Sequence, residues 1–258
     1  MSDLGLALRL ARFTNKAFWR NPASAFFTFA FPLLFLVVFT SLLGSGRLEV
    51  APGRFIEQGW YYVAAMGAFG LISATYTNLA MSVTFSRDAG VLKRMRGTPL
   101  PSWAFLSGRV LHAMGISLLL VAITAAFGVA VYGADLPTGL RLAQFASTVV
   151  VGGAAFSALG LATTAVVPNA HAAPAVVNAI VLPLLFLSGI FIPLESSSPR
   201  WMVMLGDVFP VKPFAEAVRA SYYGSPFPFA WSDLAVVVAW GVVGLLLAVR
   251  FFSWEPRR

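Results

Sequence analysis

Five stretches of the 258-residue sequence contain no aspartate, glutamate, lysine or arginine: residues 21–46, 58–86, 110–134, 142–194 and 234–249. About 20 apolar residues are enough to cross the hydrocarbon core of a bilayer. Hydrophobic residues make up 59% of the chain and charged residues only 11%, whereas soluble domains are about 25% charged. The sequence therefore excludes an ordinary soluble protein and predicts one that crosses a membrane several times.

The number of crossings follows from the lengths of these stretches. Residues 142–194 are long enough for two crossings, and the sequence Pro-Asn-Ala-His at 168–171 is typical of a turn. The last stretch is short, but Trp231 and Trp254 flank it as interfacial anchors and allow a crossing over roughly residues 231–252. We expect an all-α polytopic membrane protein with six transmembrane helices in a single domain, residues 1–258.

The basic residues predict the orientation of the chain, because lysine and arginine near span ends resist translocation. Six crossings put both termini on one side, with twelve of the 18 basic residues: Arg9, Arg12, Lys16, Arg20, Arg87, Lys93, Arg94, Arg96, Arg109, Arg250, Arg257 and Arg258. The other side has six: Arg47, Arg54, Arg141, Arg200, Lys212 and Arg219. Both termini are therefore predicted to be cytoplasmic, and the net charge of +8 needs no nucleic-acid partner to explain it.

The amino-terminal segment, residues 3–20, has the pattern of an amphipathic helix. Its basic residues Arg9, Arg12, Lys16 and Arg20 are spaced by three or four, and apolar residues line a neighbouring face. This pattern indicates an interfacial helix on the inner leaflet of the bilayer. A basic flank that only fixes topology would give the same pattern. The uncharged stretch that follows is too long for a secretory signal, so we expect it to remain as the first span.

The loop at residues 87–101, RDAGVLKRMRGTPLP, predicts a helix of about two turns. Asp88 is placed to accept the free amides of the helix start, Gly97 to adopt the left-handed stop, and Pro99 to prevent continuation. The apolar residues fall on one side and the basic residues on the rest: Val91, Leu92 and Met95, and Lys93, Arg94 and Arg96. Such a helix suits docking to a cytosolic partner; the alternative is a basic loop without a partner.

The predicted outer segment, residues 193–233, contains six prolines but many aromatic and apolar residues. Pro213 can begin a short helix with Phe214, Ala217, Val218 and Tyr222 on one face, and Gly224 can end it. We expect outer re-entrant half-helices, buried against the spans so that their backbone groups are satisfied. An interfacial hairpin outside the membrane is the alternative.

Few residues inside the spans suggest chemistry. Asn78 and Asn178 are the pathway candidates, because a buried amide needs a partner. The small residues around Gly152 and Gly160 allow close helix packing, either within the chain or in a dimer. The chain has no cysteine and two histidines, His112 and His171, which form no catalytic or metal-binding set with Asp88. We therefore assign no catalytic and no metal-binding residue, and the lack of carboxylates deep in the spans argues against an ion-coupled carrier.

Residues 90–101, GVLKRMRGTPLP, with the tryptophan that follows and the span that opens near Arg109, resemble a segment of type-2 ABC exporter permeases. The resemblance is to the daunorubicin-resistance type in particular, and Met95 and Gly97 depart from the usual Leu and Ala. It implies that this loop is the coupling helix, which sits in a cleft of a cytosolic ATPase. The residues that would carry this role are Asp88, Gly90, Val91, Leu92, Lys93, Arg94, Met95, Arg96, Gly97, Thr98 and Pro99.

The resemblance also implies an energy source outside the chain. The three lysines, Lys16, Lys93 and Lys212, are preceded by Asn, Leu and Val, so no Walker A sequence is present. ATP and Mg²⁺ would be bound by two ABC ATPase subunits, and the permease would pair with a second copy or a sister permease. The implied role is a non-enzymatic subunit in a bacterial plasma membrane that exports amphipathic drugs, antibiotics or lipid-like compounds. The alternative is a self-sufficient channel or secondary transporter.

Overall fold

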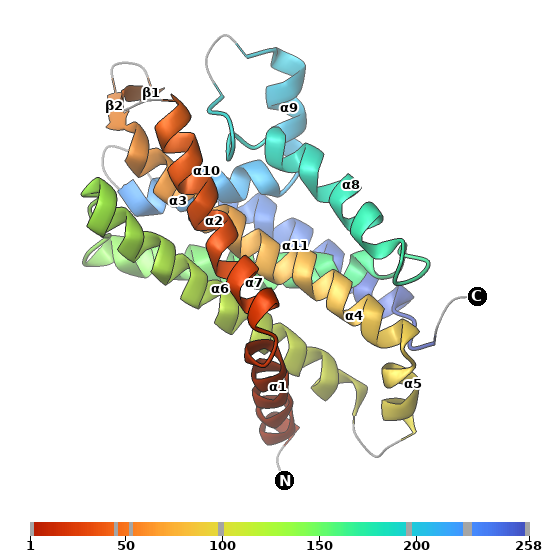
Figure 1. The fold of residues 1–258 in the computed structure, drawn as a ribbon. Helices are drawn as coiled ribbons and strands as arrows, with labels where there is room; N and C mark the ends of the chain where they lie inside the picture. The colour runs from red at the N-terminus through yellow and green to blue at the C-terminus, as the bar shows by residue number, and fades with distance from the viewer. Residues whose placement is uncertain are drawn as a thin grey trace.

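The chain folds into a bundle of helices with one small hairpin (Figure 1). The computed structural model describes residues 3–43, 46–51, 54–97, 101–194, 198–223 and 229–255. The elements are α1 (Asp3–Trp19), α2 (Pro22–Leu43), β1 (Arg47–Ala51), β2 (Arg54–Glu57), α3 (Gln58–Ile72), the π-helical turn η1 (Ser73–Thr77), α4 (Asn78–Asp88), α5 (Val91–Arg96), α6 (Ser102–Tyr132), α7 (Leu140–Thr163), α8 (Ala173–Phe186), α9 (Arg200–Val208), α10 (Val211–Tyr223) and α11 (Trp231–Phe251). The predicted all-α polytopic fold is confirmed, and the antiparallel β1–β2 hairpin is an addition that the sequence did not predict.

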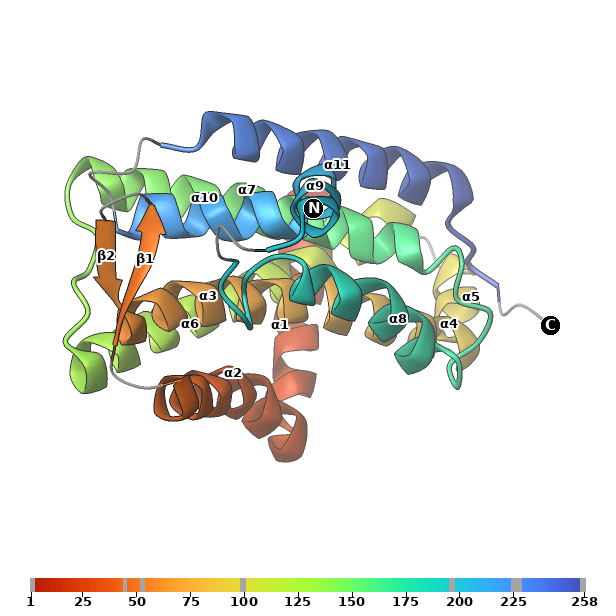
Figure 2. The same ribbon diagram turned by 90° about the horizontal axis from the view of Figure 1, so that it is seen from above.

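The centre of the bundle is one continuous helix formed by α3, η1 and α4. It covers the 31 residues Gln58–Asp88, about 46 Å at 1.5 Å per residue, and 83% of its most apolar window is buried. The corresponding fractions for α2 and α11 are 17% and 22%. Figure 2 shows α2 and α11 on opposite sides of the bundle, with the α3–α4 helix and α7 between them. The outer helices therefore keep apolar surface free for lipid or for another subunit.

The bundle has two distinct ends (Figure 1). We call the end with α1, α5 and the last turn of α11 the α5 end, and the end with β1, β2 and α9 the hairpin end. Within the described residues, five helices are long and apolar enough to cross a membrane: α2, the α3–α4 helix, α6, α7 and α11. They agree with the predicted crossings, and α11 begins at Trp231, as predicted.

The sixth predicted crossing is less regular than expected. After α7 ends at Thr163, the predicted turn is present, but α8 has only 14 residues, which is about 21 Å against a hydrocarbon core of about 30 Å. The chain continues without helix past Gly189, whose φ of 73° is in the left-handed region. The Tyr61 and Tyr62 hydroxyls donate to the carbonyl oxygens of Gly189 and Phe191. Non-helical backbone is tolerated at membrane depth where such internal partners satisfy it.

The predicted outer half-helices correspond to α9 and α10. α10 begins at Val211, two residues before Pro213, and its predicted apolar face is buried: Phe214, Ala217, Val218 and Tyr222. Gly224 lies outside the described residues. α10 packs on α7, α11 and α3, whereas the residues of α9 are mostly exposed. Re-entry of these helices into the bilayer stays a prediction.

The small residues of α7 serve packing within the chain. A Cβ atom at Gly152 would lie 2.1 Å from the Phe214 ring, and one at Gly160 would lie 2.8 Å from the Tyr76 carbonyl oxygen. Glycine is therefore required where α7 meets α10 and η1. Of the two predicted roles for these residues, the structure supports packing within the chain.

Candidate functional site

Helix α5 forms a short, separate element beyond the end of α4 (Figure 1). α4 ends at Asp88, and Gly90 changes the chain direction with a φ of 69°, a conformation that side-chain-bearing residues rarely adopt. Leu92 is fully buried, whereas Lys93 and Arg94 are exposed. The helix thus turns one apolar residue inward and presents basic side chains to the outside.

Two details of the predicted helix are wrong. Asp88 does not cap α5, because it is the last residue of α4 and its carboxylate accepts a hydrogen bond from the Ala170 backbone N–H. Gly97 has a φ of −78° and is not left-handed; Gly90 has that conformation instead, before the helix. α5 has six residues, fewer than two turns, and Thr98 and Pro99 lie outside the described residues.

The last turn of α4 is fastened to the α7–α8 turn by two side chains, which we call the Arg87–Asp88 tether. Arg87 is 1% exposed, and its guanidinium donates to the carbonyl oxygens of Thr164 at 2.9 Å, Val167 at 2.7 Å and Pro168 at 3.3 Å. A cation is favourable here because the carbonyls at a helix carboxyl end carry partial negative charge. Asp88 adds the bond to Ala170. In the sequence Arg87 indicates only the predicted topology, because nothing nearby indicates partners about 80 residues away.

Helix α1 has the predicted amphipathic character. Arg9, Arg12, Lys16 and Arg20 are all exposed, and Ala7 is 1% exposed. The buried face lies on α6, where a Cβ at Gly108 would come within 2.8 Å of the Leu10 Cβ. α1 is therefore held by the protein as well as presenting a basic face, and its contact with a bilayer stays a prediction.

The two pathway candidates are in different environments. Asn78, on α4, is exposed and lines a cavity of about 420 Å³ between α1, α2, α4 and α6. Asn178, on α8, is half-buried and does not line that cavity. His112 lines the same cavity as Asn78, whereas His171 is exposed on the α7–α8 turn. Among the described residues, no group of three acidic, histidine or cysteine side chains could hold a metal ion.

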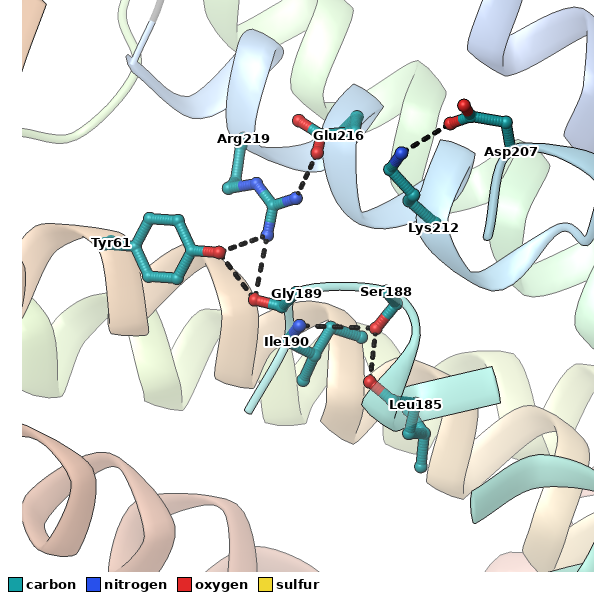
Figure 3. A network of polar contacts seen from close by, with 9 residues as sticks. All are labelled: Tyr61, Leu185, Ser188, Gly189, Ile190, Asp207, Lys212, Glu216 and Arg219. Atoms are coloured by element: carbon teal, nitrogen blue, oxygen red, sulfur yellow. Dashed lines mark hydrogen bonds and ion pairs between the residues drawn. The ribbon is translucent and has the colours of Figure 1, made fainter. Parts of the chain in front are cut away.

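A second polar cluster lies toward the hairpin end, and we call it the Tyr61–Arg219 network (Figure 3). The Tyr61 hydroxyl donates to the Gly189 carbonyl oxygen at 2.5 Å. Arg219, which is 8% exposed, donates to the Tyr61 oxygen at 3.1 Å and to the Glu216 carboxylate at 2.6 Å. Lys212 and Asp207 form a neighbouring ion pair at 2.5 Å. The network joins α3, α10 and the segment after α8, so it fastens the hairpin end of the bundle.

These features define a class of protein: a multi-pass helical membrane protein that exposes a short basic helix on one connection. Residues 7–223 match the family described as ABC-2 type transporter, which is 217 of the 258 residues (223 − 7 + 1). The chain belongs to this family. The family and the five helices long and apolar enough to cross a membrane within the described residues agree with each other.

The individual relatives are distant. The chain is 23% identical over 194 residues to the probable multidrug ABC transporter permease YbhR of Escherichia coli, covering 75% of this chain and 50% of YbhR. It is 24% identical to the putative transport permease ycf38 of Porphyra purpurea, over 88% of this chain and 76% of the relative. It is 22% identical to the putative transport permease YvfS of Bacillus subtilis, over 90% of this chain and 91% of YvfS. The chain thus spans about half the length of YbhR and most of the length of YvfS.

Proposed function

We propose that this chain is the permease subunit of an ATP-driven ABC exporter that moves amphipathic drug, antibiotic or lipid-like compounds outward. In this proposal the chain pairs with a second copy of itself or with a sister permease. Two ATPase subunits bind ATP and Mg²⁺, and each binds α5 of one permease. The α5 end faces the cytoplasm of a bacterial cell, as the distribution of basic residues supports. The printed name of YbhR, a probable multidrug permease, supports the class of cargo.

The observation that carries the proposal is the attachment of α5 to the bundle at the end of α4. It follows Asp88 after two residues, and the Arg87–Asp88 tether joins this point to the α7–α8 turn. A displacement of α5 would therefore reach both the α3–α4 helix and the helices on either side of the α7–α8 turn. A loop that served only topology would need no such attachment to the bundle.

The burial of each side chain decides which residues of α5 should test the coupling role. Leu92 is fully buried, so an aspartate there would disturb the fold as well as any docking. Lys93 and Arg94 are exposed and have no such packing role. Their replacement by glutamate should leave the permease folded and inserted. It should weaken association with an ATPase subunit, because attractive contacts of the two basic side chains are lost and like charges repel.

The test uses the permease reconstituted in vesicles with its ATPase subunits. K93E/R94E should lose ATP-driven transport and the stimulation of ATP hydrolysis by the permease. R250E is the control, because Arg250 is an exposed basic residue of α11 at the same end of the bundle, and it should transport like the wild type. Transport by the chain alone, unaffected by ATP, would refute the proposal and favour a self-sufficient channel or carrier. Unchanged ATPase association of K93E/R94E would refute the role of α5.

A further inference from the structure

A cavity near the α5 end combines a half-buried cation with apolar walls. It has a volume of about 420 Å³, within the range of small-molecule sites in proteins. Four helices form it: α1, α2, α4 and α6. Exposed residues at its margin, Ala17, Ser24 and Asn78, show that it opens to the surface of the bundle. The cavity lies apart from the Arg87–Asp88 tether, the Tyr61–Arg219 network and α5, and none of their functions requires it.

Arg109, on α6, is the charged group of this cavity. Its Nη2 atom donates to the Ser86 hydroxyl at 2.7 Å, and its guanidinium lies 5.0 Å from the centroid of the Phe105 ring. The Nε atom is buried without a hydrogen-bond partner. In the described part of the chain, no carboxylate forms an ion pair with Arg109.

Within the described residues, this arrangement gives the guanidinium one hydrogen-bond partner and leaves the buried Nε atom without one. Arginine stays charged and has five N–H donors, of which the Ser86 hydroxyl takes one. A buried charge is costly unless it is paired and hydrogen-bonded. Planar bidentate contacts with phosphate or carboxylate groups are the partners that a guanidinium favours. The cavity thus has a binding group for an anion, and no carboxylate of the described residues occupies it.

The other residues that line the cavity indicate which chemical groups the rest of the ligand would have. His112, one turn along α6 from Arg109, and Asn21 and Asn78 add polar side chains to the walls. The other walls are mostly apolar, with Phe18, Phe85, Ile116, Leu79 and Met81 among them. A small inorganic anion would use the first set of groups and leave the second unused, whereas an anion with an alkyl chain would use both.

We propose that this cavity binds the anionic head of an amphipathic molecule, with Arg109 as the principal contact. Arg109 is the eighth residue of α6, about 10 Å along the axis from its start at Ser102, so it lies in the third of this helix nearest the α5 end. A phosphate or carboxylate head joined to a hydrocarbon tail can come from a membrane lipid or from a transported compound. Both sources share this chemistry, and experiment separates them.

The probe is dodecyl phosphate with a photoreactive diazirine in its chain, added to the full-length permease in phosphatidylcholine nanodiscs. Mass spectrometry locates the labelled residues. We expect labelling on α4 and α6 that unlabelled dodecyl phosphate displaces and dodecanol does not. R109Q should weaken the displacement about tenfold, since one charged contact is lost. R109K, which keeps the charge, should weaken it less.

A second pair of variants separates binding from folding. Ser24→Phe fills the cavity and leaves Arg109 in place, so it should reduce labelling as R109Q does. Ala23→Phe, at the neighbouring exposed position on α2, is its control and should label like the wild type. R250Q removes an exposed arginine of α11 at the same end and should also label like the wild type.

Labelling that R109Q and S24F both leave unchanged would overturn the proposal. Displacement by inorganic phosphate alone, as effective as by dodecyl phosphate, would overturn the amphipathic part of it. Displacement by phosphatidylglycerol would identify a resident lipid headgroup, and loss of the probe on ATP addition to the reconstituted complex would identify a transported compound; either result supports the site. Binding is measured without ATP. If the probe does not label the cavity but ATP-driven transport is intact, this inference is wrong and the proposed function is unaffected.

Discussion

The Arg87–Asp88 tether gives the sharpest prediction, because one buried side chain holds three carbonyl oxygens. We consider Arg87→Met, which keeps an unbranched, flexible stem but shortens the side chain and removes its charge and donors. Thr164, Val167 and Pro168 would then lose their partner at the end of α7, and Asp88 would lose the cation 3.7 Å away. The substitution is confined to the interior, since Arg87 is 1% exposed, and the flexible methionine side chain can occupy part of the space without supplying a donor.

The magnitude follows from opposing terms. Hydrogen bonds to a charged group contribute roughly 1.5–3 kcal/mol each, and burying the guanidinium offsets a large part of the sum. We expect R87M to lower the free energy of unfolding by about 3 kcal/mol. Arg87→Lys keeps the charge but replaces the planar fork by one ammonium, so we expect a smaller loss of about 1.5 kcal/mol.

The assay is titration with SDS in mixed micelles, followed by transport measured per ATP hydrolysed for the variants that remain folded. R87K should transport less per ATP than the wild type, because the point where α5 joins α4 is no longer fixed to the α7–α8 turn. R250M, an exposed arginine of α11, should change the free energy of unfolding by less than about 0.5 kcal/mol. The reasoning is refuted if R87M is as stable as R250M, or if R87K transports normally.

Three further outcomes follow from packing and hydrogen bonding. Leu92→Asp should destabilise the chain by roughly 3 kcal/mol because it buries an unpaired charge, whereas Lys93→Asp should keep wild-type stability; the same SDS titration compares them. Gly160→Ala should destabilise by roughly 2 kcal/mol, since its Cβ would meet the Tyr76 backbone at 2.8 Å, while Gly67→Ala meets nothing within 4 Å; equal unfolding midpoints would contradict this. Tyr61→Phe should cost about 1–3 kcal/mol through the lost bonds to Gly189 and Arg219, with Tyr132→Phe as control.

The regular part of the fold could be predicted because the membrane imposes it. A crossing helix must be long and uncharged, so the length of uncharged sequence locates α2, α6, α7, α11 and the α3–α4 helix. The apolar face of α10 was equally legible from its spacing, because a helix buries positions three and four residues apart. These features depend on neighbours along the chain.

The missed features depend on contacts between distant segments. Asp88 looks like a helix cap in the sequence, but its partner is the amide of Ala170, 82 residues away. α8 is followed by a non-helical segment whose carbonyl oxygens at Gly189 and Phe191 accept hydrogen bonds from Tyr61 and Tyr62, and local propensity does not indicate these partners. In the sequence, Arg109 is only one of the basic residues that predict the cytoplasmic side. Its cavity forms where α1 packs on α6. A sequence pattern cannot place such partners.

The tether and the Tyr61–Arg219 network together join the same two segments at opposite ends of the bundle. At the α5 end, Arg87 of α4 holds the turn that leads into α8. At the other end, Tyr61 of α3 holds Gly189, which follows α8. Since α3 and α4 are one continuous helix, this helix and α8 form a closed frame. A push on α5 cannot slide one past the other without straining Tyr61.

The frame predicts an interaction between distant substitutions. Sites more than about 10 Å apart usually contribute additively to stability, and Arg87 and Tyr61 lie near opposite ends of a helix about 46 Å long. We expect R87K and Y61F to be additive in the free energy of unfolding. In transport per ATP, the second substitution should have little further effect, because a frame opened at one joint no longer restrains the other. Full additivity in transport would show that the two joints act independently and would contradict the frame.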